Sequence, residues 1–444
     1  MGVLLAMLVP LSAWADDAPV ATPVSFTGAD GTTLHGELIA PRGAAHRPAL
    51  VMVGGAGPVT TAELRPGAEA YARHGIPTLI YDKRTDGYST THRDFGQLAE
   101  DALAAVRLLR TRPEADPGRV GLWGLSEGAW AVSLAAGRSD DVAYVITAGA
   151  VGLTPARQQA WAYGEFLRHA GVSGSLTEAM QVTAIRQLAG AGLFAEADYD
   201  PVPAWRRVRQ PVLAEWGALD REAAPAESER IVRQALEDGG NRHFTIRTVP
   251  GVRHNLQRTF DDGFDRPTAL PADYADHEAA WIGQLADGLP PVSVDAPPAQ
   301  GVESHALAPL GWYERPWLQA CLSLFCLAGF GGYLLGGALR RLRRHPRPAD
   351  LPRLACWAAS AGAFAVLGSM TYLLFMVLTA GSLPGPVLLG RPVVWLLLQL
   401  ASVAALVCTG LAVLRGHRAR RVLLLAASGA AFVPWALYWG LLKP

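Results

Sequence analysis

The chain has 444 residues, enough for two or three domains, and its 39 basic and 39 acidic residues give a formal net charge of zero. A neutral chain offers no basic surface for phosphate groups, so we expect no nucleic-acid partner. All four cysteines lie beyond residue 320, inside long apolar runs, which excludes a disulfide framework or a thiolate metal site from the first 300 residues.

The N-terminus has the pattern of an export signal. Residues 2–12 form an apolar run that is too short to cross a bilayer, and Ala13-Trp14-Ala15 before Asp16 resembles a cleavage site with small residues at two positions. No lysine or arginine precedes the apolar run, so a short anchor or a misassigned start codon is the alternative. We interpret residues 1–15 as a signal peptide.

Residues 16–288 alternate strand and helix patterns. Val24–Phe26 and Leu34–Ile39, joined by the turn Ala29–Gly31, predict an opening β-hairpin. Short apolar runs typical of strands buried on both faces follow at Ala49–Val53, Thr78–Tyr81, Val120–Trp123, Val142–Ile146, Val212–Trp216 and Phe244–Val249. Helical patterns fall at 61–74, 96–111, 127–137, 226–238 and 273–287. This alternation predicts an α/β domain with a doubly wound, mostly parallel sheet.

One segment interrupts this alternation of strands and helices, and another follows it. Residues 152–209 have helical patterns and no strand, so we expect a helical cap over the edge of the sheet. Residues 289–315 contain paired prolines and few apolar runs, which indicates an extended linker.

The C-terminal region, 316–444, has the sequence pattern of several membrane-spanning helices, and we call it the membrane block. Four apolar stretches of roughly the ~20 residues that a span needs occur at about 317–339, 354–380, 392–414 and 422–442. The loops 340–353 and 415–421 are rich in arginine, which places them in the cytoplasm and everything before residue 316 outside. Because the spans contain no aspartate, glutamate, lysine, arginine or histidine, we favour an anchor over a transporter.

The strongest chemical motif is Gly124–Gly128, with the sequence Gly-Leu-Ser-Glu-Gly, between a predicted strand and a predicted helix. A serine on such a tight turn is raised above the sheet edge at a helix N-terminus, as in the G-x-S-x-G nucleophile elbow. Ser126 is therefore the candidate nucleophile.

A serine nucleophile needs a base and an acid that orients the base, and in this fold both follow later strands. Asp220 follows the strand at Val212–Trp216, and His254 follows the strand at Phe244–Val249. The alternatives are a helix-capping or loop acid for Asp220 and a surface histidine for His254. His277, in a charged helical stretch, is the less favoured base.

Stabilisation of an oxyanion requires two backbone N–H donors. Glu127 should supply one and the loop Gly54–Pro58 the other, with Ala56 as the first choice and Gly55 as the second. The loop has neither P-loop nor G-x-G-x-x-G spacing, which argues against a nucleotide site. We interpret Asp82-Lys83-Arg84 as carrying a buried Asp–Arg pair that shapes the active-site loop, with direct substrate contact as the alternative. We interpret the side chain of Glu127 as a complement to the helix dipole.

With these motifs, residues 22–288 resemble the bacterial α/β-hydrolase family of esterases, dienelactone-hydrolase-like enzymes and serine-aminopeptidase-like enzymes. The resemblance rests on Gly54–Pro58, Tyr81–Arg84, Gly124–Gly128, Gly217–Asp220 and Val249–His254. It implies that Ser126 is the nucleophile, His254 the general base and Asp220 its orienting acid. Leu125 and Gly54 stand where the family often has histidine, and the membrane block lies outside the resemblance.

The sequence therefore predicts a membrane-anchored serine hydrolase that cleaves carboxylic ester or thioester bonds, without metal or organic cofactor. Its expected partners are an acyl substrate and the lipid bilayer. The expected location is the bacterial inner membrane, with the hydrolase domain on the periplasmic side. A peptidase or amidase, an acyltransferase, and a non-catalytic membrane protein with a relic hydrolase domain remain as alternatives.

Overall fold

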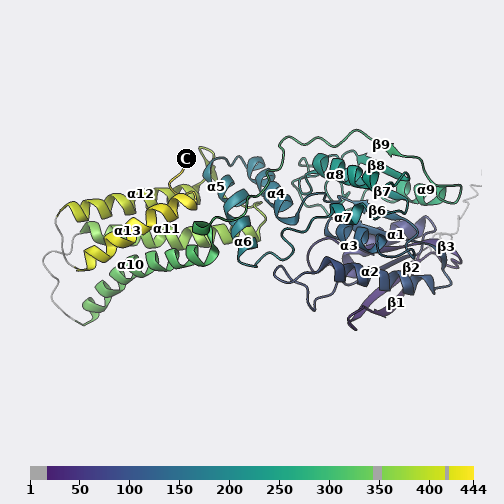
Figure 1. Cartoon of the computed structure of the whole chain (residues 1–444), viewed down its shortest axis with the longest axis horizontal. Coiled ribbons are helices and arrows are strands. Elements are labelled where there is room, and N and C mark those ends of the chain that lie inside the picture. Colours follow the sequence, from purple (N-terminus) through teal and green to yellow (C-terminus); the bar gives the residue numbers. More distant parts are fainter. Residues whose placement is uncertain (1–17, 344–352, 416–419) are drawn as a thin grey trace, which may run out of the picture. The chain divides into compact units, whose positions relative to one another are not determined.

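The computed structural model describes residues 18–343, 353–415 and 420–444 (Figure 1). The predicted signal peptide, 1–15, and parts of both arginine-rich loops lie outside the described residues. The chain divides into two compact units, one containing the residues up to Thr154 together with Tyr199–Val302, the other Pro155–Asp198 together with Glu303–Pro444.

The first unit is built on a mostly parallel sheet. Within the described residues its strands have the order β1-β2-β4-β3-β5-β6-β7-β8-β9. Strand β2 pairs antiparallel with both β1 and β4, and every other neighbouring pair is parallel. The strands are β1 (Val20–Thr27), β2 (Thr33–Ala40), β3 (Arg47–Val53), β4 (Thr78–Tyr81), β5 (Ala115–Leu125), β6 (Val145–Ala148), β7 (Val212–Gly217), β8 (Phe244–Val249) and β9 (Ser293–Val294). The chain order reverses between β3 and β5, and in open parallel sheets this point is where ligands bind.

Helices cover both faces of the sheet, which confirms the predicted doubly wound α/β fold. Along β3, Leu50 and Met52 join a core cluster with α1 and α9, whereas Val51, also fully buried, points to the other face. There α2, α3, α7 and α8 pack one against the next. The helices are α1 (Thr61–Arg73), α2 (Phe95–Arg110), α3 (Glu127–Ala136), α7 (Val202–Trp205), α8 (Pro225–Asp238) and α9 (Asp276–Gln284).

Two boundaries of the first unit differ from the expected ones. The two-residue strand β9 lies inside the predicted linker and pairs with β8, so the unit extends to Val302 rather than to residue 288. Strand β6 begins at Val145 instead of residue 142, because the apolar run enters the sheet only where it pairs with β5 and β7.

The insertion is helical, as predicted, but its packing partners are the C-terminal helices. It contains α4 (Pro155–His169), α5 (Ser175–Glu178), a π-helical segment (Ala179–Ala184) and α6 (Ile185–Gly190). Leu167, Met180 and Ile185 are fully buried in one apolar cluster with side chains of those helices. Residues 199–209 belong instead to the first unit. That the insertion covers the edge of the sheet stays a prediction.

Polar contacts also join the insertion to the C-terminal region. The buried Ser175 Oγ accepts hydrogen bonds from Trp395 Nε1 at 3.2 Å and from Gln399 Nε2 at 3.1 Å. The Arg186 guanidinium donates to both carboxylate oxygens of Glu314, at 2.8 and 2.6 Å. Apolar and polar contacts together make the insertion part of the second unit.

The C-terminal region is an apolar helical bundle of α10 (Pro316–Leu342), α11 (Arg353–Leu378), α12 (Val393–Leu414) and α13 (Arg420–Tyr438). Among the residues that the structure describes, three helical segments, Pro316–Arg340, Arg353–Leu378 and Val393–Leu414, are long and apolar enough to cross a membrane. The fourth predicted span corresponds to a shorter apolar helix, Val422–Tyr438. It ends before the predicted residue 442 because Gly440 has a left-handed φ of 84°.

Candidate functional site

Ser126 occupies a strained turn between β5 and α3. Its φ and ψ are 53° and −114°, which a non-glycine residue adopts only when its surroundings hold it there. The turn is closed by Gly128, where a Cβ atom would lie 2.4 Å from the carbonyl oxygen of Val53. The Ser126 side chain is partly exposed and lines a cavity of about 600 Å³. His254 and the Gly55-Ala56 segment also line this cavity. The turn thus has the geometry of a nucleophile elbow.

Asp220 and His254 meet in the same region. Strands β7 and β8 are neighbours in the parallel sheet, so the turns after them lie at one edge. The Nδ1 atom of His254 lies 2.8 Å from Oδ2 of Asp220, and both side chains are buried. Asp220 Oδ1 accepts the backbone N–H groups of Glu222 and Ala223, at 2.8 and 3.0 Å. These contacts fix the carboxylate, which in turn orients the imidazole.

Asp220 and His254 each stabilise the charged form of the other. Burial by itself raises the pKa of Asp220, but His254 and the two backbone N–H donors outweigh it and the net pKa is lowered. Burial lowers the pKa of His254, but the Asp220 carboxylate outweighs that effect and the net pKa is raised above 6.5. The rival histidine, His277, lies exposed on α9.

Of the two predicted oxyanion donors, Ala56 lines this cavity and Glu127 follows the cavity-lining Ser126 in the chain. Glu127 is the first residue of α3, where backbone N–H groups have no acceptor within the helix. Ala56 lies in the loop after β3 and lines the cavity together with Ser126. The sheet order explains this proximity, because β3 and β5 are adjacent parallel strands and both loops leave the same edge.

The sequence interpretation of Asp82-Lys83-Arg84 was wrong about the pairing. Asp82 is exposed and accepts the backbone N–H of Thr61 at 2.6 Å. Arg84 pairs with the buried Asp101 at 2.6 Å and with Asp30 at 2.8 Å. Asp30 lies 54 residues before Arg84 and Asp101 lies 17 residues after it, and the fold brings the three side chains together.

Lys83 and Glu127 form a buried ion pair that the sequence analysis missed. The Lys83 Nζ atom lies 2.9 Å from Glu127 Oε1, and the two side chains are 5% and 1% exposed. Arg93 donates to Glu127 Oε2 at 2.7 Å, so Glu127 does more than complement the helix dipole. Burial lowers the pKa of Lys83, and Glu127 partly offsets that shift. The available signal was that each residue lies within two positions of the end of a buried strand.

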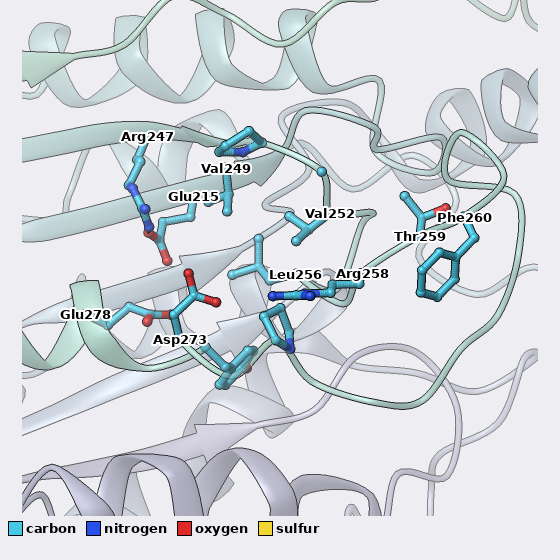
Figure 2. Close-up of a pocket in the computed structure, with 14 residues that line it drawn as sticks. Glu215, Arg247, Val249, Val252, Leu256, Arg258, Thr259, Phe260, Asp273 and Glu278 are labelled. Carbon is cyan, nitrogen blue, oxygen red and sulfur yellow. The ribbon is translucent and has the colours of Figure 1, made fainter.

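A second cavity, of about 400 Å³, lies in the first unit around β7, β8 and α9. Figure 2 shows Glu215, Arg247 and Glu278 at one end of it and Phe260 at the other. Arg247 pairs with Glu215 at 2.8 Å, and the buried Glu278 has its pKa raised well above its usual value by burial and by the charge of Glu215. Two carboxyl groups therefore share a buried site with one arginine. The sequence signal was a glutamate inside an otherwise apolar strand.

Within residues 18–343, 353–415 and 420–444, no group of three or more histidine, cysteine, aspartate or glutamate side chains is arranged to hold a metal ion.

Comparisons with known proteins agree with this architecture. Residues 30–244, just under half of the chain, match the model of the family described as X-Pro dipeptidyl-peptidase (S15 family). The match includes Ser126 and Asp220 and ends before His254. The strand order and the elbow define the class by its fold, that of the α/β-hydrolases, and residues 30–244 resemble a family of hydrolytic enzymes with that fold.

The curated relatives match over shorter stretches. The thiohydrolase aneE of Aspergillus aculeatus is 37% identical over 117 residues, which is 25% of this chain and 36% of that protein. The thiohydrolase apmlB of Arthrinium phaeospermum is 34% identical over 127 residues, 28% of this chain and 41% of that protein. The chain thus spans less than half the length of these relatives. Among solved structures, the esterase Pf2001 of Pyrococcus furiosus has 16% identity and a TM-score of 0.41, covering 61% of this chain and 91% of that one.

Proposed function

We propose that the protein is a serine hydrolase that transfers the acyl group of a carboxylic ester or thioester to water. The observation that carries the proposal is the buried Asp220–His254 pair, 2.8 Å apart, beside a cavity whose wall includes Ser126 on a strained turn. A base oriented by a buried carboxylate next to a raised serine is the arrangement that activates a hydroxyl group.

In this proposal the reaction follows the double-displacement scheme of serine hydrolases. Ser126 Oγ attacks the carbonyl carbon while His254 Nε2 takes its proton, and Asp220 holds the Nδ1–H side of the ring. The N–H groups of Glu127 and Ala56 stabilise the negative oxygen of the tetrahedral intermediate. His254 then protonates the departing alcohol or thiol, and a water molecule, activated in the same way, releases the acyl group from Ser126.

The leaving group is tested with a matched series. We expect full-length protein in detergent to hydrolyse p-nitrophenyl butyrate and a butyryl thioester faster than the corresponding butyryl anilide. Similarity to two thiohydrolases favours the thioester as the better substrate. Faster cleavage of the anilide would contradict an ester or thioester specificity.

The family match supports a second candidate, a dipeptidyl peptidase that cleaves after proline. It would use the same three side chains on an amide bond. Alanyl-prolyl p-nitroanilide separates the two candidates, because a peptidase cleaves it at a rate comparable to or above that of the butyryl ester. The same peptide with an acetylated N-terminus serves as the control for recognition of the free amino group.

We also propose that the hydrolase unit lies outside the cytoplasm, at a bacterial inner membrane. The support is the arginine distribution and the apolar helices, whose outer surfaces carry exposed residues such as Phe325, Trp357 and Leu400. A membrane-impermeant maleimide tests the topology: Glu303→Cys is expected to react in intact spheroplasts, and Arg415→Cys only after permeabilisation. Both positions are exposed, and the unmodified chain controls for its own four cysteines. The reverse pattern would contradict the orientation.

A further inference from the structure

The two segments that carry the proposed oxyanion donors are tied together by a polar network in which Lys83 and Glu127 are buried and Tyr88 is half-buried. One segment is Gly55–Gly57 in the loop after β3, and the other is Glu127 at the start of α3. Lys83 and Tyr88, from the loop after β4, contact both segments. A third strand's loop therefore bridges the two halves of the site.

Lys83 makes the first bridge. Its ammonium group donates a hydrogen bond to the carbonyl oxygen of Gly55 and another, at 2.9 Å, to Glu127 Oε1. The Gly55 carbonyl and the Ala56 N–H belong to one planar peptide unit and point in opposite directions. Holding the Gly55 oxygen therefore fixes the direction in which the Ala56 N–H points.

Tyr88 makes the second bridge. Its hydroxyl accepts the N–H of Gly57 at 2.9 Å and donates to Glu127 Oε1 at 2.5 Å. This contact fixes the peptide unit on the other side of Ala56. Ala56 consequently lies between two peptide planes that are both anchored to the side chain of Glu127, while the backbone of Glu127 supplies the other donor.

We propose that Lys83, Tyr88 and the Glu127 carboxylate are positioning residues that hold the Ala56 and Glu127 N–H groups at the separation needed to bind an oxyanion. The inference rests on the proposed hydrolase function. None of the three side chains needs to touch the substrate. They act through the backbone, in the way that a rigid shell of contacts keeps a site preorganised.

This role makes a kinetic prediction that a purely structural role does not. An oxyanion donor acts mainly on the charged transition state, so a displaced donor lowers kcat and leaves KM nearly unchanged. Loss of a whole donor costs about 10²- to 10³-fold in kcat in comparable sites. Loosening one donor should cost less, on the order of 10-fold.

The test compares two tyrosine variants of the full-length protein. Tyr88→Phe removes the hydroxyl that bridges Gly57 and Glu127. Tyr144→Phe is the matched control, because its buried hydroxyl donates at 2.8 Å to the Ala49 carbonyl, away from the cavity. Each variant loses one tyrosine hydroxyl in the same domain, so their losses of stability should be similar.

With p-nitrophenyl butyrate, Tyr88→Phe should lower kcat about 10-fold at unchanged KM, and Tyr144→Phe should change kcat less than about twofold. Butylboronic acid, whose adduct with the serine is a tetrahedral anion, should bind Tyr88→Phe about 10-fold more weakly. Lys83→Arg should retain more activity than Lys83→Met, because arginine keeps the charge and the donors.

The possible outcomes distinguish the positioning role of Lys83, Tyr88 and Glu127 from the proposed hydrolase function. A kcat loss in Tyr88→Phe no larger than in Tyr144→Phe, or a loss confined to KM, overturns the positioning role while the hydrolase proposal stands. No turnover and no boronic-acid binding by folded wild-type protein overturns both.

Discussion

Replacing Lys83 by methionine tests how much the buried ion pair contributes to the hydrolase unit. Lys83→Met keeps most of the side-chain volume and removes the charge. It leaves Glu127, whose side chain is 1% exposed, with only Arg93 as a cationic partner and removes the donor that contacts the Gly55 carbonyl. The perturbation therefore leaves two buried acceptors less well satisfied.

The expected loss in unfolding free energy follows from these contacts. Removing one partner of a buried ion pair costs about 3–5 kcal/mol, and the remaining Arg93 contact favours the lower end of that range. We expect about 3 kcal/mol. For a unit of this size, with a urea dependence near 3 kcal/mol per molar, the unfolding midpoint should fall by about 1 M.

The assay is urea unfolding of the full-length protein in detergent micelles, followed by tryptophan fluorescence. Arg138→Met is the control, because it breaks a surface pair with Glu100 whose side chains are 39% and 36% exposed. This variant should lose less than about 1 kcal/mol. Adding Glu127→Gln to Lys83→Met should recover part of the lost stability, since no buried carboxylate then lacks its lysine. Equal losses in Lys83→Met and Arg138→Met would show that the buried ion pair contributes no more to stability than a surface pair.

Three further outcomes follow from the charges around the site. Asp220→Asn should reduce kcat by about 10⁴-fold, because the amide no longer orients His254 or stabilises its protonated form. Hydrolysis of p-nitrophenyl butyrate measures this loss of kcat, and a reduction below about tenfold would contradict the role assigned to Asp220. His254 must be neutral to accept a proton, and its pKa is raised because the Asp220 carboxylate outweighs burial, so kcat/KM should fall on the acid side with a midpoint above pH 6.5. A midpoint below pH 6 would argue against this base. The raised pKa of Glu278 means that the folded protein retains a proton which the unfolded chain loses above about pH 4.5, so stability declines as the pH rises from there. Glu278→Gln should flatten this decline between pH 5 and pH 8 in urea unfolding, and an unchanged slope would exclude Glu278 as its source.

The arrangement of Ser126, Asp220 and His254 was predictable because it depends on local sequence patterns. Each residue follows a short apolar strand, and adjacent parallel strands deliver their following loops to one edge of the sheet. The elbow itself needs small neighbours for steric reasons, which a five-residue motif records. The catalytic roles of these residues stay predictions.

Contacts between distant segments were not predictable in the same way. Nothing near Lys83 in the sequence indicates that its partner is Glu127, 44 residues later, rather than the adjacent Asp82. The insertion's helices were recognised from their periodicity, but the apolar face of Met180 and Ile185 does not specify which surface it covers. Likewise, the pairing of Arg247 with Glu215 required the register of β7 and β8.

If Ser126 is an activated nucleophile, a fluorophosphonate should label it in the purified full-length protein. We predict that the wild-type protein is labelled, that Ser126→Ala is not labelled, and that His254→Ala is labelled much more slowly. Absence of labelling in folded wild-type protein, or undiminished labelling of Ser126→Ala, would show that Ser126 is not the activated nucleophile.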